Sequence, residues 1–238
     1  MNPTSSRRGM VVSTDHYASI AGIEILRKNG NAIDAAVATA FSMAVSYPSC
    51  GNICGDGFML YHGADNTVTT FDFRAIAPKA ANMKMFLNER GELKVSAWEG
   101  VISVGVPGTV LGMELAHSRF GSLPWDQLVE PAINLSENRF KVDERLYREM
   151  KACERAFREY PSSGKIFLKT DGSFYQPGDT LKQPDLAETL RRIQKHGSHD
   201  FYHGETARLL VEFIQDNGGI LTLQDLADYR VIEDRLFN

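Results

Sequence analysis

The spacing of apolar residues near the start of the chain predicts two helices in succession. In the first, over Tyr17–Asn29, the residues Ala18, Ala21, Gly22 and Ile25 recur at the i, i+3, i+4, i+7 spacing of one helix face. The second, with the sequence AAVATAFSMAV, is apolar on nearly every side. A helix of that kind lies buried in the core rather than on the surface.

Capping signals set the limits of these two helices, which follow a short strand expected over Gly9–Ser13. Gly30 stands where the first helix would end in a left-handed residue. Asn31 is a good N-cap for the second helix, and Asp34 falls at its N3 position, where a negative charge is favourable. Pro48 ends that helix.

A hairpin follows, reached through a loop that holds three glycines. Phe58–Tyr61 and Val68–Phe73 have strand composition, and Ala64–Asn66 between them is a turn. Arg74 comes directly after the second strand. A guanidinium at the end of an apolar hairpin is unusual enough to need an explanation.

The second half of the chain is dominated by amphipathic helices with charged outer faces. We expect a strand, helices and one irregular polar segment, in this order: a strand over Val101–Val106, a helix over Thr109–Phe120, a helix entered at Trp125 and interrupted at Pro131, a helix over Asp143–Tyr160, the polar segment Pro161–Gln183, and helices over Pro184–Lys195, His203–Asp216 and Thr222–Tyr229.

Composition narrows the class of protein. The 238 residues are 43% hydrophobic and 24% charged, which is ordinary for a globular protein with a sizeable core. The net charge of −4 argues against nucleic acid or an anionic membrane as a partner. No apolar run approaches the ~18 residues of a membrane span. No signal peptide is recognisable, so we expect a cytoplasmic protein, or a periplasmic or extracellular one if a leader has been removed.

Cysteines and histidines give no strong metal or redox signature. Cys50 and Cys54 form a C-x3-C pair without a second pair, and we expect free, packed thiols. His196, His199 and His203 have spacings that could suit a metal ion, but they span a helix end, a loop and a helix start. We therefore expect them to have capping and surface roles, and we predict neither a metal nor a cofactor.

Six local motifs occur in the order found in one protein family. They are NGNAIDAAVA at 29–38, CGDGFML at 54–60, DFRAIAP at 72–78, VGVPGTVLG at 104–112, GSLPWDQLVEPAI at 121–133, and FYHGETARLL with NGGILTLQDLADY at 201–229. Over residues 9–231 the chain resembles the large-subunit part of γ-glutamyltranspeptidases. Each motif alone is a weak signal of the family, but six of them in the family's order argue against a chance resemblance.

The resemblance implies an α+β fold, the four-layer αββα sandwich of N-terminal-nucleophile hydrolases, with residues 1–238 as a single domain. It also implies a precursor that cuts itself. The new N-terminal threonine of the small subunit is then the nucleophile and its own amine is the base. On this basis we expect no catalytic residue in this chain, a small-subunit partner, and no activity of this chain alone on γ-glutamyl amides such as glutathione.

The resemblance assigns one substrate-binding residue, Arg74, which matches the arginine that holds the α-carboxylate of the glutamyl group. A guanidinium suits this task because its planar donors bind a carboxylate through two parallel bonds. The residues alone leave a second interpretation open: Arg74 could pair with Asp72, Asp56 or Asp15 and only close the hairpin end. One departure from the family is Ala75, where an acidic residue often follows the arginine.

Three functions are compatible with this sequence. The first is transfer or hydrolysis of γ-glutamyl amides. The second is an amide hydrolase or acylase of the same fold that acts on another carboxylate-bearing amide, an alternative that Ala75 keeps open. The third is a non-catalytic chain that binds a partner or a ligand.

Overall fold

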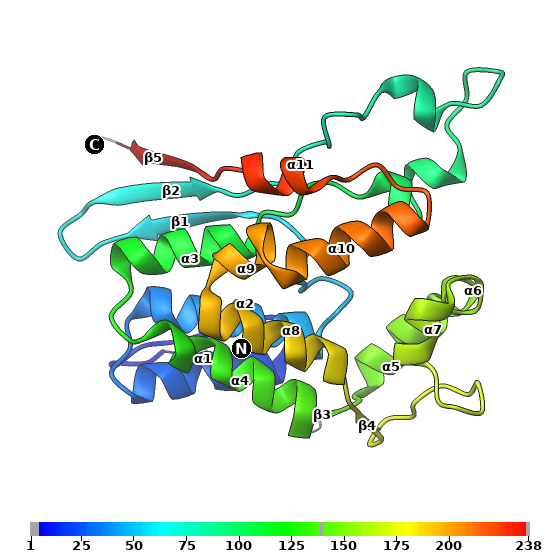
Figure 1. The fold of residues 1–238 in the computed structure, drawn as a ribbon. Helices are drawn as coiled ribbons and strands as arrows, with labels where there is room; N and C mark the ends of the chain where they lie inside the picture. Colours follow the sequence, from blue (N-terminus) through cyan, green and yellow to red (C-terminus); the bar gives the residue numbers. More distant parts are fainter. Residues whose placement is uncertain (1–4, 139, 237–238) are drawn as a thin grey trace. The chain divides into compact units, whose positions relative to one another are not determined.

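The computed structural model describes residues 5–138 and 140–236 and is drawn in Figure 1. The chain divides into two compact units, each assembled from two segments that are distant in sequence. The first unit combines Met1–Asn52 with Gly121–Gln194, and the second combines Ile53–Phe120 with Lys195–Asn238. Arg74 lies in the second unit.

The first unit is mainly helical. Helix α2 packs against both α1 and α4, and Val37, Ala38 and Phe41 of α2 are almost fully buried, as its apolar sequence predicted. The elements are α1 (His16–Arg27), α2 (Ala32–Ser46), α4 (Trp125–Asn138), α5 (Glu144–Ala152), α6 (Glu154–Glu159), α7 (Pro161–Phe167), most of α8 (Pro184–His196), and the paired strands β3 (Phe140–Lys141) and β4 (Thr180–Leu181).

Asp34 joins two of the six motifs inside this unit. Asn31 caps α2 as predicted, and its own N–H donates to the Asp34 carboxylate at 2.9 Å, which completes a capping box. The same carboxylate accepts the backbone N–H and the hydroxyl of Ser122, at 3.0 and 2.5 Å. Burial would raise the pKa of Asp34, but these hydrogen bonds outweigh it and leave the pKa below its ordinary value.

The second unit contains a three-stranded antiparallel sheet with the order β1-β2-β5 (Figure 1). The predicted hairpin is confirmed, and a strand at the end of the described chain adds to its β2 edge. The elements are β1 (Phe58–His62), β2 (Val68–Asp72), β5 (Ile232–Leu236), α3 (Thr109–Phe120), α9 (Ser198–His203), α10 (Glu205–Asp216), α11 (Leu223–Asp228), and the short 3-10 turns η1 (Met83–Phe86), η2 (Val95–Ala97) and η3 (Val101–Ser103).

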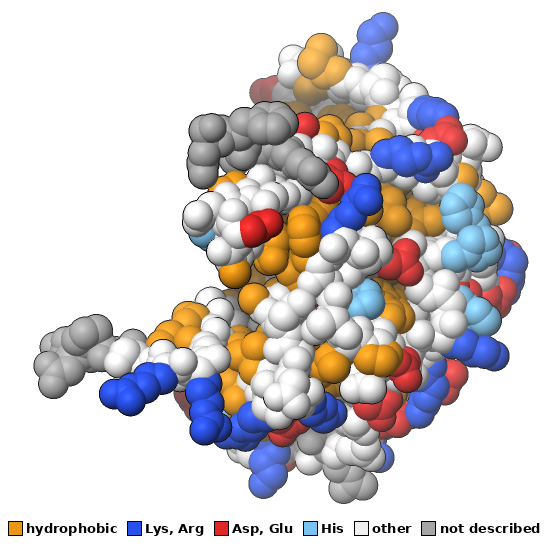
Figure 2. Space-filling view, turned by 90° about the vertical axis from the view of Figure 1, so that its left-hand side faces the viewer, with side chains coloured by type: hydrophobic (Ala, Val, Ile, Leu, Met, Phe, Trp, Pro, Cys, Tyr) orange, Lys and Arg blue, Asp and Glu red, His pale blue; other side chains and the backbone are white. Residues whose placement is uncertain are grey.

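The two faces of this sheet have different environments. On one face, Phe71 is fully buried, and the Tyr61 ring stacks on Phe120 of α3 with centroids 4.2 Å apart. On the other face, Phe58, Leu60 and Ile232 are 78%, 65% and 59% exposed. Apolar side chains are also visible at the surface in the space-filling view (Figure 2). Among the described residues, the sheet therefore has one covered face and one largely uncovered face, which carries these apolar side chains together with Asp72.

Several predicted elements differ from the observed ones. Gly9–Ser13 is not a strand in the structure, and Val11 instead lies against Gly22 of α1. The left-handed residue after α1 is Asn29, with φ of 66°, rather than Gly30. Val101–Val106 forms the turn η3 and a single bridge from Val106 to Ile76.

The helices of the second half also depart from prediction in four places, the first of which is α9, a helix where the sequence analysis expected a loop. Helix α4 continues through Pro131 because proline removes only one N–H, while the buried face around Leu128 and Ile133 holds the helix in place. The helix expected over Asp143–Tyr160 divides into α5 and α6 at Cys153, whose ψ of 12° is not helical. The polar segment that follows contains α7, which the sequence analysis missed.

Within residues 5–138 and 140–236, none of the helices combines the length and the apolar character needed to cross a bilayer.

Candidate functional site

The residue before Arg74 fixes the end of β2. Phe73 is 5% exposed, and its N–H donates to the Gly57 carbonyl at 3.0 Å, so the chain stays paired with the glycine loop just beyond the strand. The Phe73 ring lies over Gly112 of α3, where an added Cβ would come within 2.3 Å of it. Arg74 therefore leaves the sheet from a rigid position.

Gly108 lets the VGVPGTVLG turn approach this strand end closely. A Cβ there would lie 2.0 Å from the Phe73 carbonyl oxygen and 2.2 Å from the Tyr229 hydroxyl. Both distances are far shorter than a van der Waals contact, so only glycine fits at this position. The Gly108 N–H also donates to the Gly55 carbonyl, at 2.9 Å. Four of the six motifs thus meet around Arg74 in the second unit.

The guanidinium of Arg74 pairs with Asp72, two residues earlier on the same side of the chain. Its Nε donates to both carboxylate oxygens, at 3.0 and 3.2 Å, and Nη2 donates to Oδ2 at 2.6 Å. These bonds, with one from the Arg74 N–H, lower the pKa of Asp72 to about 2. They also raise the pKa of Arg74 above its ordinary value.

The pairing uses only one edge of the guanidinium. Within the part of the chain that the structure describes, Nη1 has no hydrogen-bond partner, and the Arg74 side chain is 65% exposed. An arginine has two edges that can hold a carboxylate: Nε with one Nη, and the outer Nη1–Nη2 edge. Asp72 occupies the first, and the outer edge remains available.

The other acids that could pair with Arg74 have different partners. Asp15 accepts a hydrogen bond from Arg145 at 3.0 Å and caps α1. Asp56 accepts the backbone N–H of Ala75 at 2.9 Å. The carbonyl oxygen of Arg74 itself accepts a hydrogen bond from the Tyr229 hydroxyl, also at 2.9 Å. Of the three acids that the sequence analysis offered as partners of Arg74, Asp72 is the one that pairs with its guanidinium. Tyr229 is a neighbour of Arg74 to which the sequence analysis assigned no role.

The histidine and cysteine candidates do not form a site. His199 and His203 lie one turn apart on α9 with ring centroids 5.3 Å apart, but no group of three or more metal-ligating residues occurs among the described residues. Cys50 and Cys54 are free thiols, as expected, but they are exposed rather than packed.

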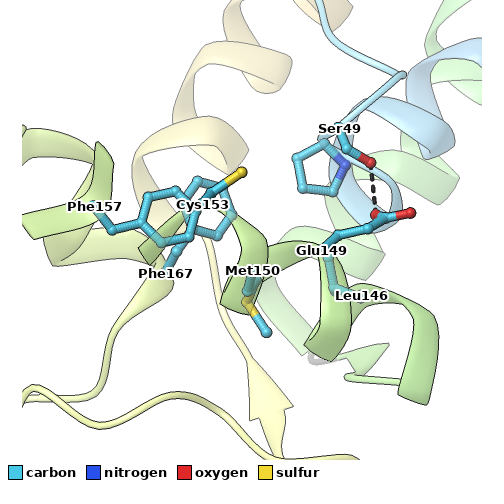
Figure 3. Close-up of a pocket in the computed structure, with 8 residues that line it drawn as sticks. Ser49, Leu146, Glu149, Met150, Cys153, Phe157 and Phe167 are labelled. Carbon is cyan, nitrogen blue, oxygen red and sulfur yellow. Dashed lines mark hydrogen bonds between the residues drawn. The ribbon is translucent and has the colours of Figure 1, made fainter. Parts of the chain in front are cut away.

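A separate pocket lies in the first unit, beside α5 (Figure 3). It has a volume of about 160 Å³ and an almost entirely apolar lining that includes Met150, Phe157 and Phe167. At the rim of the pocket the Ser49 hydroxyl donates a hydrogen bond to the Glu149 carboxylate at 2.7 Å. The carboxylate that lines this pocket therefore already has a partner. The described residues that line this pocket include no lysine or arginine that could bind the carboxylate of a donor substrate. It is therefore a different place from the one that Arg74 indicates.

Comparison with known proteins decides the family. The family model of γ-glutamyltranspeptidase matches residues 18–236, nearly the whole chain. The chain belongs to the γ-glutamyltranspeptidase family. A relative from Pseudomonas aeruginosa, named glutathione hydrolase proenzyme, is 42% identical over 224 residues, which cover 94% of this chain and 39% of the relative.

Solved structures give the same result for the fold. The γ-glutamyltranspeptidase of Helicobacter pylori superposes with a TM-score of 0.94 at 39% identity, covering 98% of this chain and 67% of that one. A cephalosporin acylase from Bacillus halodurans superposes with a TM-score of 0.84 at 30% identity, covering 98% and 45%. The predicted fold class, that of N-terminal-nucleophile hydrolases, is confirmed. The chain spans about 40% of the length of the curated relatives it matches.

Proposed function

We propose that this γ-glutamyltranspeptidase-family chain supplies the donor-binding arginine of an enzyme that transfers or hydrolyses γ-glutamyl amides, glutathione among them. Arg74 occupies the arginine position of the DFR-type tract, just after the central strand of the sheet. The observation that supports its role most directly is that only one of the two edges of its guanidinium is used within this chain. Asp72 orients one edge, and the outer edge faces solvent with donors to spare. A glutamyl α-carboxylate fits that edge through two parallel hydrogen bonds.

The acyl-transfer chemistry belongs, on this proposal, to a downstream segment. A hydroxyl nucleophile needs an adjacent base, and the N-terminal threonine of a small subunit would supply both the hydroxyl and the amine. This chain would then orient the donor, while the partner attacks its γ-amide carbonyl. We accordingly expect no turnover by this chain alone.

The uncovered sheet face supports a protein partner for this chain. Phe58 and Leu60 of β1 and Ile232 of β5 lie on one side of the three-stranded sheet and are largely exposed. In an αββα sandwich, each sheet packs one face on helices and the other on a second sheet. Since α3 covers one face here, we propose that the small subunit provides the sheet that covers the other.

An acylase that takes a different carboxylate-bearing amide is the second candidate. The observation that favours it is Ala75, which is exposed and cannot supply the acid often found after this arginine in the family. A cephalosporin acylase among the structural neighbours has the same fold at 30% identity. Both candidates use Arg74 to hold a carboxylate, and they differ in the acyl group.

A comparison of two donors and three enzymes tests the role of Arg74. The complete protein that contains this chain would be assayed with a γ-glutamyl anilide and with the 4-aminobutanoyl anilide, which lacks the α-carboxylate. Charge-assisted hydrogen bonds contribute roughly 1.5–3 kcal/mol, so Arg74→Ala should lower kcat/KM for the glutamyl donor by about tenfold to a few hundredfold. Arg74→Lys should fall between, and neither change should affect the second donor.

Arg119→Ala is the matched control, because Arg119 is also an exposed arginine in an ion pair, 2.9 Å from Glu233. It should leave both donors unaffected. Equal losses of the two donors in Arg74→Ala, accompanied by a lower melting temperature, would remove Arg74 from donor binding.

A further inference from the structure

The peptide group that follows Arg74 is held at both of its polar atoms by side chains. Its carbonyl oxygen accepts a hydrogen bond from the Tyr229 hydroxyl, and its N–H, which belongs to Ala75, donates to Oδ2 of Asp56. Both distances are 2.9 Å. Strand β2 has already ended at Asp72, so no sheet ladder holds this peptide group. We call Asp56 and Tyr229 the peptide clamp.

Tyr229 is itself rigidly placed. It is 1% exposed, and its ring stacks on Tyr202 with centroids 5.8 Å apart and an angle of 11° between the planes. The Tyr202 hydroxyl in turn donates to the Pro107 carbonyl at 2.8 Å. Burial, with the charges of Asp72 and Asp56, raises the pKa of Tyr229 to about 12, so its hydroxyl keeps its proton and remains a donor at neutral pH.

Asp56 is held by the loop that carries it. The residue before it, Gly55, accepts hydrogen bonds from the N–H groups of Gly108 and Thr109, at 2.9 and 3.1 Å. The residue after it, Gly57, accepts the N–H of Phe73 at 3.0 Å. The Asp56 carboxylate therefore approaches the Ala75 N–H from backbone that is paired on both sides.

Two-point binding of a carboxylate needs a guanidinium fixed in position and in direction. Asp72 fixes the direction of the Arg74 side chain and also accepts the Arg74 N–H at 3.0 Å, but these hydrogen bonds do not reach the peptide group that follows Arg74. We propose that Asp56 and Tyr229 are positioning residues for Arg74, which fix its backbone so that the outer guanidinium edge meets the α-carboxylate of the donor. This inference rests on the proposed function of Arg74.

The test compares two tyrosine variants in the complete protein. Tyr229→Phe removes the hydroxyl that holds Arg74 and keeps the ring stack. Tyr202→Phe removes a buried hydroxyl from the same stack with no bond to Arg74, so both should lower the melting temperature to a similar degree. Only Tyr229→Phe should raise KM for the γ-glutamyl anilide, roughly three- to tenfold with kcat little changed, as expected for the loss of one hydrogen bond.

A second pair of variants examines Asp56. Asp56→Ala removes the acceptor of the Ala75 N–H, whereas Asp56→Asn keeps a carbonyl oxygen of the same reach. The rise in KM should be larger for Asp56→Ala than for Asp56→Asn, and neither should change KM for the 4-aminobutanoyl anilide.

A double variant separates this inference from the proposed function. In an Arg74→Ala background, Tyr229→Phe should add no further rise in KM, because there is no guanidinium left to position. If Arg74→Ala affects both donors equally, the proposed function itself fails. If Arg74→Ala is selective but Tyr229→Phe matches Tyr202→Phe, or raises KM equally without Arg74, the peptide clamp is overturned.

Discussion

At the scale of single residues, Asp72 determines how Arg74 can be used. Side chains two residues apart lie on the same face of a strand, so the DFR order places an acid beside the arginine. In the structure this acid takes the Nε edge of the guanidinium. Pairing with Asp72 and binding of a donor are therefore compatible, although they seemed to be alternatives in the sequence.

Asp72→Asn should weaken donor binding without unfolding the protein. The amide cannot accept three N–H bonds with the strength of a carboxylate, so the guanidinium gains freedom. We expect KM for the γ-glutamyl anilide to rise roughly five- to twentyfold, with kcat changed by less than about twofold. In this chain the pair is on the surface, so Asp72→Asn should lower the melting temperature of the isolated chain very little. A large fall in melting temperature with an unchanged KM would make Asp72 structural only.

The pH dependence of this effect follows from the pKa of Asp72, which is lowered to about 2. A carboxylate whose pKa is lowered on folding keeps its pairing above the ordinary pKa and loses it only as the pH falls through the lowered value. The ratio of variant to native KM should thus be the same at about pH 5 and about pH 8. A ratio that falls toward one at the lower pH would contradict this assignment.

Sequence reasoning proposed Arg74 as a site residue through a short motif, and it identified the Asn31–Asp34 cap, which the structure confirms, through local spacing. Such signals involve neighbours within a few positions. Tyr229 is 155 positions from Arg74, and Asp56 is 19 positions from Ala75. Their contacts depend on the register of the folded chain, so no local pattern could predict them.

At the scale of elements, helices with a strong apolar stripe or clear caps were predicted well, as α8 and α2 illustrate. The failures have a common cause, since they are segments whose state depends on distant partners. Ile232–Leu236 becomes a strand because β2 offers it an edge, and Val101–Val106 has an apolar strand composition but only a single bridge. Helix α4 survives Pro131 through packing that its own sequence does not reveal.

The uncovered face of β1 gives an element-level prediction. If a second sheet covers it in the complete protein, Leu60→Lys places a charge in a buried interface and should destabilise that protein by about 2–4 kcal/mol. The matched control is Leu209→Lys on α10, where Leu209 is 41% exposed outside the sheet. Thermal melting would compare the two. Equal, small shifts would indicate that nothing covers this face.

At the scale of the whole molecule, the six family motifs fall into two structural groups. NGNAIDAAVA and GSLPWDQLVEPAI meet through Asp34 in the first unit, where they stabilise helix starts. The other four surround Arg74 in the second unit. The sequence analysis could match all six to the family, but only the fold separates the motifs with a structural role from those that form the proposed site.

The most direct measurement of the central claim is an experimental structure of the complete protein with glutamate bound. The account predicts that both oxygens of the α-carboxylate lie within about 3 Å of Nη1 and Nη2 of Arg74, with Asp72 still on the Nε edge. It also predicts that Tyr229 and Asp56 hold the Arg74–Ala75 peptide group as they do here. A glutamate whose α-carboxylate is bound by other residues, with the outer edge of Arg74 empty, would contradict the account.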